Sequence, residues 1–547
     1  MYIHLILVIC FFNFTKSKSL KNLDDKYELI VVGGGLAGLT AAFESYIKSN
    51  NSIKILIIEQ LKYLGGNSKR ATSGINYLQS EPQKLNKIED NYTLFYNDTM
   101  KSGKNTNNPR LVEVFAKGKK SLYNFYKINF GIDTNLISQL GGHSVARTHR
   151  PTDSKFVIGH YLITKISEKI KNINNIKILY NSTVTKLLKS EKNNKIYGLK
   201  YKNNLEIKEN IIYCDAIILS SGGFGHDFGE KGLLKEFVPN IMNFPSTNGP
   251  QSKGFGIKLA SEIGANLVDM DKVQVHPTWF VDQKNRYNKD KFLAPELLRG
   301  VGGILINQKG ERFCNELGTR DYVTNKIKEN CYKQNTNKIE QYECFLLMNE
   351  EMEKEFGKNF YYYKNVKGFI LEHENFYELS KNLSINYTKL NITINLYNNA
   401  FDKKIDEFNK TVFSYKFNLN KKIYSMIVTP SIHYTMGGIK INEKGEVLNF
   451  LDEPIYGLYA AGEVTGGVHG KNRLGGNSLA ECGVFGRISA DSAVNYILKN
   501  NNKNNNGKKE FRIALIFEIL IVVLILFIYF ITRKGYENNN LGNYYLL

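Results

Sequence analysis

The sequence has few of the residues that hold metals and redox centres. Six Cys occur in 547 residues, and none belongs to a CxxC pair, a CxxCH haem-attachment motif or a Cys/His set with zinc spacing. We therefore expect no bound metal, haem or iron–sulfur cluster. Cys331 and Cys344 could pair in an oxidising compartment, although free thiols are equally consistent with the sequence.

The sequence also lacks any RNA- or DNA-binding motif, and its aromatic residues are not interleaved with a basic stripe. Its formal net charge of +21 comes from Lys scattered through a chain rich in Asn, which is typical of biased composition. We expect no nucleic-acid partner. With 547 residues, 42% of them hydrophobic, the chain is too long for one simple domain, so two closely packed domains are expected.

Both ends of the chain carry apolar runs. Residues 1–19 combine YIHLILVICFFNF with the small and polar TKSKS, which is typical of a signal peptide. A hydrophobic anchor is the alternative, because no Lys or Arg precedes the run. Residues 513–531 are long enough to cross a bilayer, and their one charge, Glu518, lies near the start. The Asn/Lys-rich residues 499–512 are typical of a flexible linker, and residues 532–547 form a tail.

These ends give conflicting signals for membrane orientation. Lys508, Lys509 and Arg512 precede the apolar run, and only Arg533 and Lys534 follow closely, which favours a cytosolic body. A signal peptide instead requires a lumenal body, and a translocated domain fixes the topology before the last helix is made. The sequence thus predicts a membrane-anchored protein of the secretory pathway, in the endoplasmic reticulum, with a lumenal catalytic body. A tail-anchored protein facing the cytosol and a mitochondrial protein are the alternatives.

A nucleotide-binding turn is predicted near the start, in YELIVVGGGLAGLTAAFESY. Gly33 makes a tight turn after an apolar strand, Gly35 lets a pyrophosphate reach the N-terminus of a helix, and Gly38 lets that helix pack on the strand. The next strand, KILIIEQ, ends on Glu59, at the distance where an acid meets a ribose. An acid there disfavours a 2′-phosphate, which leaves FAD or NAD.

Three further glycine-rich loops follow. Glycine at this density prevents a stable helix or long strand and lets the backbone approach a ligand closely. LGGNSKRATSGINY, residues 64–77, offers backbone and small side chains to a flat ring system, and AIILSSGGFG, residues 216–225, follows another buried strand. In AAGEVTGGVHGKNRLGGNSL, residues 460–479, the charged side chains would face whatever the loop approaches.

Together with VQVHPT (273–278), NELGTRDYV (315–323) and HYTMGG (433–438), these loops make the chain resemble the flavoprotein of the fumarate reductase/succinate dehydrogenase superfamily. It is most similar to the soluble fumarate reductases of the yeast and bacterial flavocytochrome type. The resemblance implies an α/β fold in which a Rossmann-like FAD-binding domain is interrupted by a smaller α+β clamp (capping) domain. The FAD-binding domain would comprise residues 27–271 and 433–498, and the clamp or substrate domain residues 272–432.

The resemblance implies FAD as the cofactor. Membrane-bound relatives attach FAD through a His in the loop that corresponds to residues 64–77, and this loop has none, so the FAD would be noncovalent. Glu463 would hold ribose or ribityl hydroxyls, and a helix opening at Ser478 would favour anionic reduced flavin. The implied cofactor positions are Gly33, Gly35, Ala37, Gly38, Glu59, Asn67, Ser68, Ser73, Gly74, Val184, Tyr434, Glu463, Ser478 and Leu479.

The same resemblance implies a dicarboxylate site, which needs cationic clamps, hydrogen-bond donors and an acid. Arg473, whose planar fork suits bidentate binding, and His433 would hold one carboxylate, and His276 the other. Arg320 would give the proton to the substrate carbon. The remaining implied positions are Glu296 and Arg299, which would return the proton to Arg320, and Gly476 and Gly74, which would line the substrate.

Three positions depart from the family pattern. Phe255 replaces an acid that relatives carry after TNGP, Pro295 replaces a Thr, and Leu293 stands where bacterial members have Met. The sequence predicts an FAD-dependent fumarate reductase that forms succinate. Action on another unsaturated or 2-amino dicarboxylate, and a noncatalytic flavin-binding redox role, are the alternatives. Since no second dinucleotide fingerprint is visible, electrons would come from outside, from free reduced flavin or a separate reductase.

Overall fold

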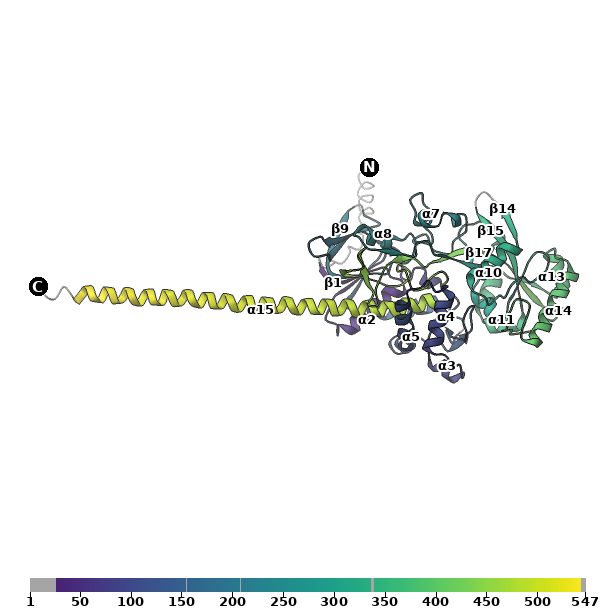
Figure 1. Cartoon of the computed structure of the whole chain (residues 1–547), viewed down its shortest axis with the longest axis horizontal. Coiled ribbons are helices and arrows are strands. Elements are labelled where there is room, and N and C mark those ends of the chain that lie inside the picture. Colours follow the sequence, from purple (N-terminus) through teal and green to yellow (C-terminus); the bar gives the residue numbers. More distant parts are fainter. Residues whose placement is uncertain (1–25, 154, 207, 336–338, 543–547) are drawn as a thin grey trace, which may run out of the picture. The chain divides into compact units, whose positions relative to one another are not determined.

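The computed structural model describes the backbone of residues 26–153, 155–206, 208–335 and 339–542 (Figure 1). Within these ranges, the side chains of residues 335, 502–515 and 533–542 are not described. The expected signal peptide, residues 1–19, lies outside the described residues. Cys331 and Cys344 are free thiols.

An eight-stranded sheet forms the nucleotide-binding part of the body. Its central strands are parallel and almost wholly apolar, as expected for strands buried on both faces. Because the strands are parallel, their carboxyl ends lie at one edge of the sheet, and the glycine-rich loops that follow them meet there. The strands are β1 (Lys26–Val32), β2 (Ile55–Ile58), β6 (Ile176–Leu179), β7 (Ser182–Ser190), β8 (Lys195–Asn203), β9 (Glu209–Leu219), β19 (Glu446–Leu448) and β20 (Pro454–Ala460).

Helices with clear end signals accompany this sheet. Helix α5 (Pro109–Phe130) begins with Pro at its first position, after the Asn108 carboxamide, which accepts from the backbone N–H groups of Arg110 and Leu111. It ends at Gly131, whose φ of 61° is the left-handed conformation that glycine adopts freely. The other helices of this part are α2 (Leu36–Lys48), α3 (Glu81–Leu85), α4 (Tyr92–Ser102), α6 (Ile158–Lys171), α7 (Leu233–Phe237), α8 (Phe255–Glu262) and the 3₁₀ turns Ser68–Arg70 and Pro239–Ile241.

A second, mostly antiparallel sheet of seven strands lies between residues 273 and 435, where the clamp domain is predicted. Its long strands are β11 (Val273–Phe280), β15 (Glu340–Asn349) and β17 (Ile423–Thr435), and its shorter ones β12 (Phe292–Leu293), β13 (Ile304–Ile306), β14 (Tyr332–Asn335) and β16 (Leu371–His373). The accompanying helices are α9 (Glu296–Gly300), α10 (Arg320–Asn330), α11 (Glu350–Phe356), α12 (Asn359–Tyr361), α13 (Phe376–Asn382), α14 (Tyr387–Lys403), a 3₁₀ turn at Gln283–Asn285 and a π-helical turn at Tyr362–Val366.

The described chain also contains two small sheets. One consists of β3 (Ile75–Asn76), β4 (Leu136–Ser138) and β5 (Thr148–Arg150), and the other of β10 (Leu267–Val268) and β18 (Gly438–Ile439). The chain up to Ala493 forms one compact unit, so the predicted division into FAD-binding and clamp domains stays a prediction.

Helix α15 (Asn477–Gly542) begins in this unit and continues into a second one from Val494. It includes residues 499–512, where the sequence predicts a flexible linker. The linker prediction was therefore wrong for these residues. The helix continues through them because adding residues to an existing helix costs far less free energy than starting a new helix. Within the part of the chain that the structure describes, no helix has the length and hydropathy needed to cross a bilayer. The predicted span 513–531 begins outside the described side chains, and those from Ile516 to Ile531 are exposed.

Candidate active site

A cavity of about 980 Å³ lies at the carboxyl edge of the parallel sheet and is also lined by residues of the second sheet. Every predicted cofactor position lines it except Gly38, and so do the predicted substrate positions His276, His433, Arg473, Gly476 and Gly74. Arg320 lines it as well, whereas Glu296 and Arg299 lie behind the wall. Residues spread over more than 400 positions of the sequence thus come together around one space.

The glycines after β1 have the geometry that the sequence predicts. Gly33 has a φ of +109°, and a Cβ there would lie 2.5 Å from the Ser220 carbonyl oxygen. A Cβ at Gly38 would lie 2.0 Å from the Gly33 carbonyl oxygen, so only glycine lets α2 pack this closely. Gly35 caps α2 without a side-chain hydrogen bond and lines the cavity, which leaves a helix N-terminus available to an anion.

Glu59, at the end of β2, borders the same part of the cavity. One carboxylate oxygen accepts from the Gly34 backbone N–H at 2.7 Å and the other from that of Leu61 at 2.8 Å. Burial raises the pKa of Glu59 above its ordinary value, and the backbone hydrogen bonds oppose this rise. The Glu59 carboxylate therefore stabilises the glycine turn through these hydrogen bonds. The contact of Glu59 with a ribose stays a prediction.

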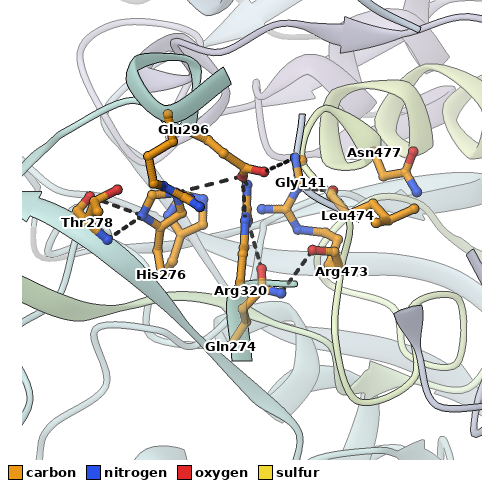
Figure 2. Close-up of polar contacts among 12 residues, drawn as sticks. Gly141, Gln274, His276, Thr278, Glu296, Arg320, Arg473, Leu474 and Asn477 are labelled. Atoms are coloured by element: carbon orange, nitrogen blue, oxygen red, sulfur yellow. Dashed lines mark hydrogen bonds and ion pairs between the residues drawn. The ribbon is translucent and has the colours of Figure 1, made fainter. Parts of the chain in front are cut away.

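Arg320, at the cavity wall, forms an ion pair with Glu296 behind it (Figure 2). Arg320 starts α10 and Glu296 starts α9, and Glu296 Oε2 lies 2.8 Å from Arg320 Nε and 2.7 Å from Nη2. The other carboxylate oxygen of Glu296 accepts from the Gly141 backbone N–H at 3.0 Å. Burial alone would raise the pKa of Glu296, but Arg320 and Arg299 lower it below its ordinary value. Glu296 is thus an ionised partner that holds the Arg320 guanidinium at the cavity wall.

Arg299 lies on the same short helix as Glu296 and is fully buried. Its Nη1 donates to the Glu316 carbonyl oxygen at 2.6 Å, and its Nε and Nη2 have no hydrogen-bond partner in the part of the chain that the structure describes. Of the predicted Arg–Glu–Arg chain, the structure has one direct ion pair, Arg320 with Glu296. Arg299 is a nearby cation that acts on Glu296 through its charge.

The two predicted histidines come from neighbouring antiparallel strands, His276 from β11 and His433 from β17, and their rings lie 5.2 Å apart. Nδ1 of His276 lies within hydrogen-bond distance of the Thr278 backbone. Nδ1 of His433 lies 3.1 Å from the Thr247 hydroxyl. Burial and then Arg320 place the pKa of both imidazoles well below the ordinary value. Both rings are therefore neutral near pH 7, and each can offer a hydrogen bond without adding charge.

Arg473 lies in the glycine-rich loop before α15 and is 4% exposed. Its guanidinium covers the Tyr434 ring at 4.2 Å, and its Nε has no hydrogen-bond partner among the described residues. Burial and then Arg320 lower the pKa of Arg473 to about 10, so it stays cationic. A buried guanidinium without a carboxylate partner is costly, and an anion in the cavity would compensate it.

Buried polar residues that the sequence reasoning did not identify hold this loop. Gln274 donates to the Arg473 carbonyl oxygen and accepts from Arg320 (Figure 2). It lies two residues before His276 on the same strand, and this alternation could have revealed it. Asn76 donates to the Gly475 carbonyl oxygen at 2.7 Å. The Tyr434 hydroxyl donates to Glu481 at 2.6 Å, and the same carboxylate oxygen lies 2.9 Å from Nε2 of His469.

This fold and site are those of a flavoprotein oxidoreductase, and its cavity is lined by cationic side chains. The family model described as FAD binding domain matches residues 28–479. Fumarate reductase 1 of Saccharomyces cerevisiae is 39% identical over 480 residues, which cover 85% of this chain and 98% of that protein. The fumarate reductase of Schizosaccharomyces pombe is 35% identical and covers 86% and 90%, respectively. This chain belongs to the fumarate reductase flavoprotein family.

A solved structure of a fumarate reductase has the same fold. The open conformation of a flavocytochrome c3 fumarate reductase aligns with a TM-score of 0.67 at 28% identity and covers 86% of this chain and 79% of that one. FAD is the cofactor, and the residues present fit it. The Gly33 and Gly38 turn, the N-terminus of α2 at Gly35 and the cavity lined from Gly33 to Leu479 provide the space and the backbone donors that a dinucleotide needs.

Proposed function

We propose that this chain is an FAD-dependent fumarate reductase that forms succinate with electrons from an external donor. One observation carries the proposal: two guanidinium groups and two neutral imidazoles line one buried cavity, and the only direct carboxylate contact of the guanidinium groups among the described residues is that of Arg320 with Glu296. This arrangement leaves Arg473 for a carboxylate of the substrate.

The arginine and histidine side chains at the cavity would bind the two carboxylates of the substrate at different positions. Arg473 and His433 would hold one carboxylate, and His276 the other. Neutral imidazoles suit this role because they donate hydrogen bonds without adding positive charge that would hold succinate too tightly. Gly476, with a φ of +76°, and Gly74, with a φ of +145°, bring backbone close to the substrate where a side chain would not fit.

FAD, when bound and reduced, supplies the hydride. Arg320 would give a proton from its guanidinium to the adjacent carbon of the substrate. Glu296 Oε2, at 2.7 Å from Nη2, is ionised and would keep Arg320 in its charged form. To return a proton to Arg320, Glu296 would first have to take one up itself. Arg299 would complete the return path. The same site would accept other unsaturated or 2-amino dicarboxylates only where both carboxylates keep these partners.

Anaerobic oxidation of reduced methyl viologen by the FAD-loaded full-length protein tests the proposal. Fumarate should drive rapid oxidation, Arg320→Ala should abolish it, and Arg473→Ala should mainly raise the KM for fumarate. Arg110→Ala, which changes an exposed arginine on α5, is the matched control. Full retention of FAD with no fumarate-dependent oxidation in the unaltered protein would favour a noncatalytic flavin-binding role.

Noncovalent attachment of FAD belongs to the proposal, because residues 64–77 contain no His. Acid precipitation should release the flavin, and flavin retained on the precipitated chain would contradict noncovalent binding.

Membrane anchoring through residues 513–531 is also part of the proposal. The apolar sequence and the exposed side chains of Ile516 to Ile531 on α15 support it. Truncation after residue 512 should release the body from membranes at alkaline pH, and a full-length chain extracted equally well would contradict the anchor.

A lumenal body in the secretory pathway is proposed from residues 1–19, with a cytosolic or mitochondrial body as the alternative. Asn181, Asn382 and Asn386 begin possible glycosylation sequons. A shift in mass on glycosidase treatment would support the lumenal assignment, and protease accessibility of the body in intact microsomes would contradict it.

A further inference from the structure

Three buried cysteines, Cys314, Cys331 and Cys344, lie in the part of the chain that carries the second sheet, and all three are free thiols. Cys331 directly follows α10, the helix that Arg320 begins, and Cys344 lies in β15. These three thiols lie outside the lining of the active-site cavity. They form a cluster that the proposed reaction does not use.

The strand register places Cys331 directly opposite Cys344. Strands β14 and β15 are antiparallel, and Tyr332 pairs with Glu343, so one further step along the two strands brings Cys331 opposite Cys344. The backbone of Cys331 is already extended, with a φ of −115° and a ψ of 154°. Side chains of opposed residues lie on the same face of a sheet. The two thiols are accordingly in hydrogen-bond contact.

The backbone geometry of this pair suits a disulfide. Opposed residues of an antiparallel pair have Cα atoms about 5.5 Å apart where they exchange backbone hydrogen bonds, and about 4.5 Å apart where they do not. The Cys331 N–H donates to the Ile327 carbonyl oxygen at 3.0 Å, so the pair with Cys344 is of the second kind. Disulfides join Cα atoms about 4.4–6.8 Å apart. A bond between Cys331 and Cys344 therefore requires no shift of either strand.

The three thiols differ in their access to a reagent. Cys331 is 8% exposed, whereas Cys344 and Cys314 have no exposed surface. Burial raises the pKa of Cys344 well above its ordinary value. Burial and then the Glu316 carboxylate raise the pKa of Cys314 in the same way. Since the thiolate is the reacting form, a reagent from solvent reacts at Cys331 first, and Cys314 is a poor competitor.

From this geometry we propose that Cys331 and Cys344 are a modification site, at which a small disulfide oxidant of the glutathione disulfide class joins them through a Sγ–Sγ bond. Cys331 attacks one sulfur of the oxidant, and the first oxidant thiol leaves. Cys344 then attacks Cys331 Sγ in the mixed disulfide, and the second oxidant thiol leaves. The two cysteines lose two electrons and two protons, and the two released thiols carry them. This inference goes beyond the proposed function and does not depend on it.

The bond would connect the elements that carry two of the substrate residues. Helix α10 has Arg320 at its first position and Cys331 directly after its last, and β15 pairs with β17, which carries His433. The bond closes a loop of about 14 residues, and a disulfide of this size stabilises mainly by restricting the unfolded chain. The melting temperature of the protein should therefore rise by about 3–6 °C on oxidation.

Peptide mass spectrometry of the FAD-loaded full-length protein tests the proposal. The reduced protein is incubated with oxidised glutathione, quenched in acid, alkylated with N-ethylmaleimide and digested without reduction. We expect a disulfide-linked peptide pair that contains Cys331 and Cys344, and two alkylated thiols in its place when dithiothreitol is added before the quench. The matched control is Cys214→Ser, which removes a buried thiol of β9 and should leave the linked pair intact.

Cys331→Ser and Cys344→Ala should each remove the linked pair and the rise in melting temperature, and Cys214→Ser should keep both. Glutathione that stays on Cys331 as a mixed disulfide, a bond between Cys314 and Cys344, or full alkylation after oxidation would each overturn the proposal. If a variant fails to fold, the peptides of the unaltered protein still decide. These readouts need no turnover, so a chain that forms the bond but reduces no fumarate would refute the proposed function and leave the modification site standing.

Discussion

Gln274 links the two arginines of the site. Its Oε1 accepts a hydrogen bond from Arg320 Nη1 at 2.8 Å, and its Nε2 donates to the Arg473 carbonyl oxygen at 2.9 Å. The side chain is 4% exposed, so water does not compete for either bond. The Gln274 amide on β11 thereby connects Arg320, the proposed proton donor, to the loop that carries Arg473, the proposed carboxylate ligand.

Replacing this amide should lower turnover without removing a reacting group. Gln274→Leu keeps the size of the side chain and removes a hydrogen bond to a charged group, worth about 1.5–3 kcal/mol, so kcat/KM for fumarate should fall about 10- to 100-fold. FAD content should stay constant, since Gln274 does not line the cavity. Steady-state kinetics with reduced viologen check this, and unchanged kinetics would show that Gln274 does not position Arg320.

The shape of the Arg320 side chain, as well as its charge, should determine kcat. Arg320→Lys keeps a cation beside Glu296 but loses the fork that contacts Glu296 through Nε and Nη2 and Gln274 through Nη1. We expect kcat to fall about 10²- to 10⁴-fold, as for loss of a general acid, with little change in succinate affinity. Spectral titration with succinate measures that affinity. A variant with near-normal kcat would exclude Arg320 as the proton donor.

The nucleotide turn was predictable because the strand–glycine–helix order is visible in the sequence itself. Gly38 packs against the Gly33 carbonyl oxygen within this segment, whereas the contact of Gly33 with Ser220 at the end of β9 is long-range and was not needed for the prediction. The resemblance to a known family supplied His276, His433, Arg320 and the other substrate positions, which spacing alone could not bring together. The structure places them around one cavity.

The supporting residues were not predictable in the same way. Asn76 meets Gly475 across about 400 positions of sequence, and Glu481 receives both Tyr434 and His469, so nothing local marks these contacts. Residues 499–512 were misread for the opposite reason, because Asn-rich composition says little about a helix that enters from residues before it. Local composition thus failed where long-range packing or helix continuation decides the outcome.

A methyl group at Gly38 tests the nucleotide turn. In Gly38→Ala the new Cβ would approach the Gly33 carbonyl oxygen to 2.0 Å, and backbone cannot yield as a flexible side chain does. Overpacking of this kind costs about 1–3 kcal/mol, so FAD affinity and thermal stability should both fall. Gly229→Ala is the matched control, since its Cβ meets nothing within 4 Å. Equal FAD affinity in the two variants would contradict the close packing of α2 on β1.

Glu463 should make the FAD-free protein less stable as the pH rises. Burial raises the pKa of Glu463 from 4.5 to about 7. Between these values the unfolded chain has lost a proton that the folded chain keeps, so stability falls with increasing pH and stays reduced above about pH 7. Glu463→Gln cannot ionise, and relative to the unaltered protein its unfolding free energy should therefore rise by about 1–3 kcal/mol between pH 4.5 and pH 8.

Urea unfolding of the FAD-free protein at several pH values measures this difference. Glu443→Gln, which removes an exposed carboxylate, controls for the loss of one negative charge. Parallel stability curves for the unaltered protein and Glu463→Gln would mean that Glu463 is ionised in the folded state near pH 6. In that case the buried carboxylate would already be charged where it borders the cavity, and it would accept hydrogen bonds from FAD hydroxyls without first losing a proton.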